Sequence, residues 1–152
     1  MASVLYSEIF SSFLGRISDY ELAELDEADA VERLTEYLHK SVADPFIHKL
    51  FSSVVLNDEA ETLDFVMKIT VSDEEDVEFV INVLSERMVV AWLSPSVMSK
   101  INIAQYFGGK ESNFFSQANH LEQLRGILKD AKLTVRKMIR DRDYSDPSRL
   151  EG

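Results

Sequence analysis

Glu36 and His39 are the pair best suited to metal chemistry, because a Glu-x-x-His spacing places both side chains on one face of a helix. A carboxylate-bridged metal pair in a helical bundle needs a second such motif and two more inward-facing glutamates. The sequence contains no second motif, and the neighbouring Leu34 and Leu38 occupy the face that we expect to be buried. We therefore expect no metal site.

Other catalytic signatures are equally incomplete. The sequence has no cysteine, no His-x-x-x-His zinc motif and no Gly-x-Ser-x-Gly nucleophile elbow. Residues 108–112, Gly-Gly-Lys-Glu-Ser, resemble a phosphate-binding loop only superficially, because they lack its first glycine at the required spacing. Gly108 and Gly109 are better explained as the end of one helix before the next. We expect no catalytic residue, no cofactor and no enzymatic activity.

Acidic and basic residues are segregated along the chain, whose formal net charge is −11. Residues 19–38 hold eight acids and one base, residues 57–79 hold nine acids and one base, and residues 125–140 hold six bases and one acid. The net charge disfavours general binding to nucleic acid or to anionic membranes. The asymmetry can be satisfied within one subunit or between subunits packed head to side, while solvated helix faces are the simpler alternative.

Hydrophobic periodicity predicts one mainly α domain over residues 1–142, a helical bundle with a long C-terminal helix, followed by a tail over 143–152. The second helix is expected to bury Ala30, Val31, Leu34, Leu38 and Val42, and to end or kink at Pro45. Ser94-Pro95 is read as the start of a new helix. The expected helices cover residues 3–17, 26–44, 72–93, 94–107 and about 114–142.

Residues 62–71 alternate between apolar and polar side chains and form the clearest strand signal. A single strand leaves its backbone groups unpaired, so it needs a partner. Residues 54–56 of the same chain, or a strand from another copy, could supply one. We therefore expect a small β-strand or hairpin insertion around 54–71.

The last helix carries an apolar stripe with heptad spacing and a basic opposite side. The stripe comprises Leu121, Leu124, Leu128, Ala131, Val135 and Met138, and the basic residues are Arg125, Lys129, Lys132, Arg136, Lys137 and Arg140. Phe114 and Phe115 are adjacent and cannot share one face of this helix, so one of them should point away from the core. This pair is our first candidate for an interface.

Five segments together resemble a known family. They are residues 6–13, residues 17–20, residues 88–95 with the sequence MVVAWLSP, residues 115–121 with the sequence FSQANHL, and residues 139–144 with the sequence IRDRDY. In this order and spacing they are similar to head-tail connector (adaptor) proteins from the neck of tailed bacteriophages. The resemblance covers most of the chain except the region around 54–71, and its motifs are not catalytic signatures.

The resemblance implies a helical structural protein of the virion neck, made in the host cytoplasm and placed between capsid and tail. It implies a ring of about twelve copies under the portal protein that docks the next neck or tail protein. DNA would pass through the channel without specific binding, and no membrane would be involved. The C-terminal segment, roughly 140–152, would grip the portal. The expected interface residues are Phe114, Phe115, Asn119, Arg136, Lys137, Arg140, Arg142 and Tyr144.

Three alternatives stay open at this point. Within the neck, a stopper or tail-terminator protein is the nearest rival, and a predominantly β fold would favour it. An acidic protein that mimics DNA and inhibits a host nuclease would explain the net charge, although it would not explain the basic last helix. A small helical metalloenzyme is disfavoured by the missing second metal motif.

Overall fold

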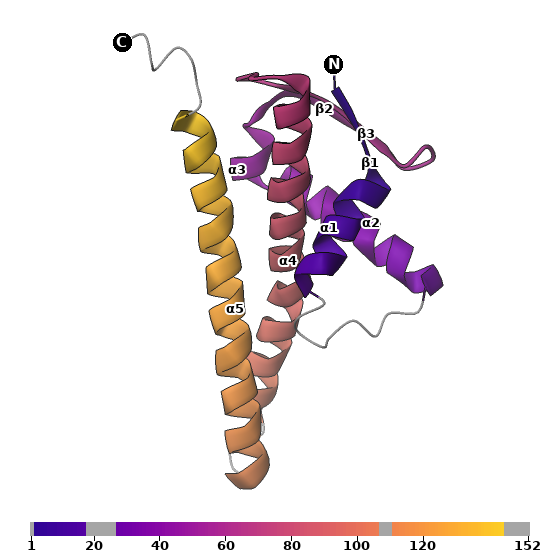
Figure 1. The fold of residues 1–152 in the computed structure, drawn as a ribbon. Helices are drawn as coiled ribbons and strands as arrows, with labels where there is room; N and C mark the ends of the chain where they lie inside the picture. The colour runs from indigo at the N-terminus through magenta and orange to yellow at the C-terminus, as the bar shows by residue number, and fades with distance from the viewer. Residues whose placement is uncertain (1, 18–26, 107–110, 145–152) are drawn as a thin grey trace.

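The computed structural model describes residues 2–17, 27–106 and 111–144, with side chains described over 2–17, 31–95 and 122–143. Most of these residues are helical, and a small antiparallel sheet lies at one end of the molecule (Figure 1). The elements are β1 (Ala2–Leu5), α1 (Tyr6–Ile17), α2 (Glu27–Ala43), α3 (Pro45–His48), β2 (Phe51–Asn57), β3 (Thr62–Met67), α4 (Asp73–Tyr106) and α5 (Glu111–Tyr144). The expected mainly α fold with a small β region is confirmed, and the expected long last helix is supported over residues 122–143.

Helix α4 is the central element of the fold. Helix α5 runs antiparallel along one side of it, and α1 and α2 pack on its other side (Figure 1). The apolar stripe predicted on α5 is buried at Leu124, Ala131 and Val135. Helix α4 buries residues around most of its circumference, among them Val80, Val83, Leu84, Met88 and Leu93, as its sequence indicated.

The break predicted at Ser94-Pro95 is wrong, because α4 continues through Pro95 to Tyr106. Ser94 does not cap a new helix, since its hydroxyl donates a 2.7 Å hydrogen bond to the carbonyl oxygen of Val90, four residues earlier. Pro95 has no N–H to bond to the preceding turn, so the helix loses one backbone hydrogen bond there. The start of α4 is as predicted, with the Ser72 hydroxyl accepting a hydrogen bond from the Glu75 N–H.

The sheet has the strand order β1-β3-β2, with both neighbouring pairs antiparallel. Strand β3 pairs with β2 through a tight hairpin, so the predicted strand finds its partner within the chain. The helix expected over 3–17 is wrong in its first residues, because Ala2 to Leu5 form an edge strand on β3. That strand pairs with the backbone groups on the second edge of β3, and the helix begins only at Tyr6.

The sheet and the N-terminal helices share the core with α4. Phe13 is fully buried and its ring meets Trp92 of α4 edge-on at 6.2 Å between centroids. In α2, Leu34, Leu38 and Val42 are buried as expected, whereas Val31 is 49% exposed, so its placement in the core was wrong.

The boundary between α2 and α3 lies beside Pro45, where the sequence predicted that the second helix would end or kink. Helix α2 ends at Ala43, before Pro45, and Asp44 caps α3 by accepting a 2.9 Å hydrogen bond from the Phe46 N–H. Helix α5 extends to Tyr144, two residues beyond the predicted end, within the usual spread of helix boundaries. The predicted helix end at Gly108-Gly109 and the rest of the tail, 145–152, lie outside the described residues.

Candidate interaction surface on the last helix

The exposed side of α5 is strongly basic. Its cations are exposed at Arg125, Lys129, Lys132, Arg136, Lys137 and Arg140. Arg125 lies 3.6 Å from Glu122 one turn away, and Arg140 lies 3.9 Å from Asp141, both weak contacts on the helix surface. The other four cations form no ion pair with any residue that the structure describes. The charge asymmetry of the sequence is therefore not neutralised at this face.

Two grooves flank the basic residues of α5. One, of about 370 Å³, lies between α3, α4 and α5; its apolar lining includes Phe46, Val90, Val135 and Ile139. The other, of about 290 Å³, runs along α5 with Leu128 and Leu133 among its lining residues. Lys132 and Arg136 line both grooves and form a basic ridge between them. Apolar floors beside unpaired cations suit contact with an acidic protein surface.

Arg142 is not part of this exposed face. It is 8% exposed, and its Nη2 donates hydrogen bonds to the carboxylate of Asp76 and, at 2.9 Å, to the carbonyl oxygen of Ile69. Its guanidinium also lies 5.1 Å from the centre of the Phe79 ring. Arg142 therefore joins the end of α5 to the start of α4. Its expected role in an interface is replaced by a role within the fold, because its charged group is already paired and buried.

The heptad stripe of α5 indicates that Arg142 is buried. Continuing its alternating steps of three and four from Met138 leads to Arg142, so this arginine belongs to the apolar seam and not to the basic back. Asp76, its partner, lies 66 residues earlier in the sequence. The sequence therefore indicates that Arg142 is buried, while its partner is visible only in the fold.

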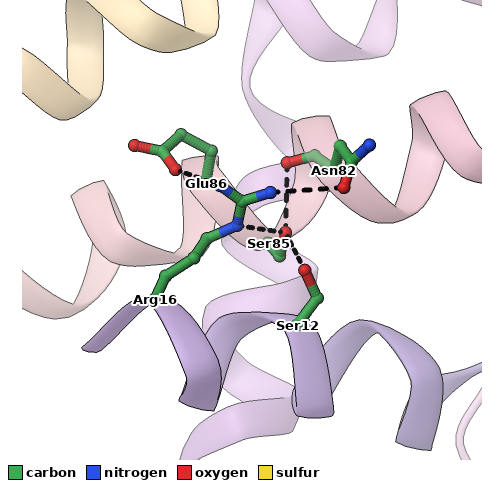
Figure 2. Close-up of polar contacts among 5 residues, drawn as sticks. All are labelled: Ser12, Arg16, Asn82, Ser85 and Glu86. Atoms are coloured by element: carbon green, nitrogen blue, oxygen red, sulfur yellow. Dashed lines mark hydrogen bonds and ion pairs between the residues drawn. The ribbon is translucent and has the colours of Figure 1, made fainter. Parts of the chain in front are cut away.

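Arg16 anchors α1 to α4 through a second, partly buried polar group (Figure 2). Its Nε donates to the Ser85 hydroxyl at 2.9 Å, and its Nη1 donates to the Glu86 carboxylate at 2.8 Å. The hydroxyls of Ser12 and Ser85 are also 2.9 Å apart, and Ser85 is fully buried. Every group points into this helix contact, so the arrangement fixes the packing of α1 and offers no free nucleophile.

Arg87 provides a third link, between α4 and the turn that precedes α3. Its Nε donates a 2.9 Å hydrogen bond to the Asp44 carboxylate, and both side chains are about one-fifth exposed. Its Nη1 is buried and has no hydrogen-bond partner among the described residues. The pair holds the wall of the larger groove in place beside the basic ridge.

His39 does not act with Glu36. Its Nε2 lies 2.8 Å from Oδ1 of Asp58 in the hairpin turn, and the Tyr6 hydroxyl donates a 2.7 Å hydrogen bond to the same oxygen. These hydrogen bonds, Tyr6 first and His39 second, hold the pKa of the Asp58 carboxyl below its ordinary value. Burial, reinforced by the hydrogen bond to Asp58, raises the pKa of the Tyr6 hydroxyl. The three groups tie the start of α1, α2 and the hairpin turn together.

Several expected interface residues fall outside the described side chains. Phe114, Phe115, Asn119 and Tyr144 lie on α5, but their side chains are not among those described. Arg136, Lys137 and Arg140 are exposed on α5. The groove-lining apolar residues Phe46 and Leu133, 59% and 49% exposed, were missed, because exposed apolar residues have no signature of their own in a sequence.

Among the described residues, no cluster of three or more His, Asp or Glu side chains could hold a metal ion. Within the same residues no helix is both long and apolar enough to cross a lipid bilayer. The chain matches no family model, no curated protein and no solved structure.

Proposed function

We propose that this protein is a structural subunit of the neck of a tailed bacteriophage, a head-tail connector. It forms a ring of about twelve copies under the portal protein and docks the next neck or tail protein. It is made in the host cytoplasm and ends up in the virion between capsid and tail. The proposal starts from the five sequence segments that resemble this family.

The observation that carries the proposal is the unpaired basic face of α5. Four of its cations have no ion-pair partner among the described residues, although the protein as a whole carries a net charge of −11. The two flanking grooves add apolar surface beside these charges. A face of this kind fits a protein that is packed by neighbours on assembly.

Two further features are in keeping with a connector. The mainly helical architecture favours an adaptor over a stopper or tail-terminator protein, for which a β fold was the expectation. The net negative charge would let DNA pass through a channel without binding its wall, because phosphates are repelled by excess acid. A DNA mimic is less suitable, since it should present continuous acid where α5 presents bases.

The test is co-purification with the portal. Purified protein is mixed with portal-bearing capsids or isolated portal protein, and the complex is separated by size-exclusion chromatography with mass measurement. The proposal predicts a stable complex containing many copies per portal. A protein that always elutes apart from portal, or that instead binds a nuclease as a monomer or dimer, would refute it.

Two sets of variants locate the contact with the portal and with neighbouring copies. Removing residues 145–152 leaves α5 complete to Tyr144 and should reduce portal binding without changing the unfolding midpoint. A charged residue at Phe114 or Phe115, tested singly, should weaken assembly at whichever of the two is exposed. Normal assembly of both variants would remove this pair from the interface.

A further inference from the structure

A third exposed groove, which is acidic, lies along the first turns of α4. Its lining residues are Asp73, Glu74, Val77, Glu78, Ile81 and Asn82, and its volume is about 540 Å³. Val77 and Ile81 supply an apolar floor, and both are partly buried. The exposed carboxylates of Asp73, Glu74 and Glu78 make no ion pair with any described residue.

The smaller groove on α5 has the same construction with the opposite charge. Leu128 and Leu133 contribute apolar surface, and Arg125, Lys129, Lys132 and Arg136 surround it. Leu133 is 49% exposed, which leaves an apolar side chain uncovered in the middle of a basic face. Each groove thus presents the charge that the other lacks.

The spacing of the side chains in the two grooves also agrees. Glu74 and Glu78 are four residues apart on α4, as Lys132 and Arg136 are on α5. Residues four apart form a ridge along a helix, and ridges of this kind pack into the grooves of a second helix at a preferred crossing angle. A pair of carboxylates can therefore meet a pair of cations one turn apart, with the apolar residues between them.

One copy cannot bring its own two grooves together. The Arg142–Asp76 contact sets α4 and α5 antiparallel, with the start of α4 beside the end of α5. With that register, Glu78 lies level with residues near 140, whereas the α5 groove spans residues 125–136. Their centres are offset by about ten residues, or about 15 Å at the rise of an α-helix.

We propose that the acidic groove at the start of α4 in one copy receives the basic groove of α5 in the next copy. The contact is heterologous, because two different surfaces meet, and repetition closes into a ring or extends into a filament. The inference rests on the proposed assembly role and names the surfaces that carry it.

Charge reversal separates this contact from a general effect of net charge. Glu78→Lys changes the net charge from −11 to −9, and Arg136→Glu changes it to −13. If long-range repulsion between copies controlled assembly, the first variant would assemble better and the second worse. The proposed contact predicts that both variants assemble more weakly, by about tenfold or more in dissociation constant, because each places like charges opposite one another.

Mixing the Glu78→Lys and Arg136→Glu variants is the decisive experiment. The reversed acidic groove of one variant then faces the reversed basic groove of the other, and the unaltered grooves also match. Assembly should return in the equimolar mixture, and in a chain carrying both changes. Sedimentation velocity over about 1 to 500 μM protein, at about 150 mM salt where long-range charges are screened, measures it directly.

Matched controls reverse exposed charges outside both grooves. Glu59→Lys in the hairpin turn and Arg33→Glu on α2 produce the same two net charges and should leave assembly unchanged. Single variants that assemble like the wild type, a mixture that stays apart, or a wild type that is monomeric throughout would each overturn the proposal. Portal binding is measured separately. If the protein does not bind portal but the charge-reversal variants behave as predicted, only the connector role is refuted.

Discussion

Replacing Arg142 should damage the fold itself and not merely an external contact. The side chains of Arg142 and Asp76 are only 7% and 4% exposed, and their ion pair joins the end of α5 to the start of α4. Arg142→Met keeps much of the side-chain length but leaves the Asp76 carboxylate buried without its cation. Arg140→Met, on the same helix, changes a side chain that is 64% exposed and serves as the matched control.

The expected magnitude follows from the burial. Removing one member of a buried ion pair costs about 3–5 kcal/mol, because the remaining charge stays out of water. The Arg142 variant also loses the hydrogen bond to the Ile69 carbonyl and the contact with the Phe79 ring. The exposed Arg140 should contribute within about 0.5 kcal/mol. Adding Asp76→Asn to Arg142→Met removes the stranded charge and should restore about 2 kcal/mol.

Urea unfolding followed by circular dichroism measures these differences. For a slope of about 2 kcal/mol per molar urea, the midpoint of Arg142→Met should fall by about 2 M, with the slope unchanged. An Arg142 variant that unfolds like the wild type, or one whose loss is equalled by the Arg140 variant, would refute the argument that this arginine is a residue of the core.

Three other perturbations test the internal contacts. Phe13→Ala should cost about 3–5 kcal/mol by urea unfolding, because the ring is fully buried against Trp92, and a loss below about 1 kcal/mol would contradict that packing. Ser85→Ala should cost about 1–3 kcal/mol, since it leaves Arg16 Nε without its partner in a partly buried contact, and a neutral result would contradict this role of Ser85. Tyr6→Phe should change how stability depends on pH. The lowered pKa of Asp58 means that its ionised form stabilises the fold above the unfolded-state pKa, and this stabilisation is lost on acidification through the folded-state pKa. The raised pKa of Tyr6 means that its stabilisation is fully present below pH 10.0 and is lost as pH rises above that value. The stability difference between wild type and this variant should therefore shrink at both ends of the pH range, and a difference independent of pH would contradict the hydrogen bond.

Elements governed by local periodicity were predictable from the sequence. The alternation over 62–71 identified β3, although the strand ends at Met67, and residues 54–56 were correctly named as a possible partner. The heptad stripe located the buried side of α5, and the charges opposite it are exposed as predicted. In each of these cases the pattern of one segment determines which side is buried.

Features that depend on distant contacts were not predictable. Ala2 to Leu5 become a strand because β3 offers a free edge about sixty residues later, and four residues carry too little alternation to show it. Ser94-Pro95 can start a helix or lie within one. Here the helix continues, and the Ser94 hydroxyl bonds back to Val90. The acidic groove of α4 combines ordinary helix-start acids with apolar residues that only the packing leaves open.

The most direct test of the assembly role is to image the protein together with its proposed neighbour. Portal-bearing capsids are incubated with an excess of the protein and examined by electron microscopy with averaging about the portal axis. We expect an added ring of density beneath the portal, with the DNA channel continuing through its centre. Capsids whose portal vertex is unchanged at saturating protein would contradict it.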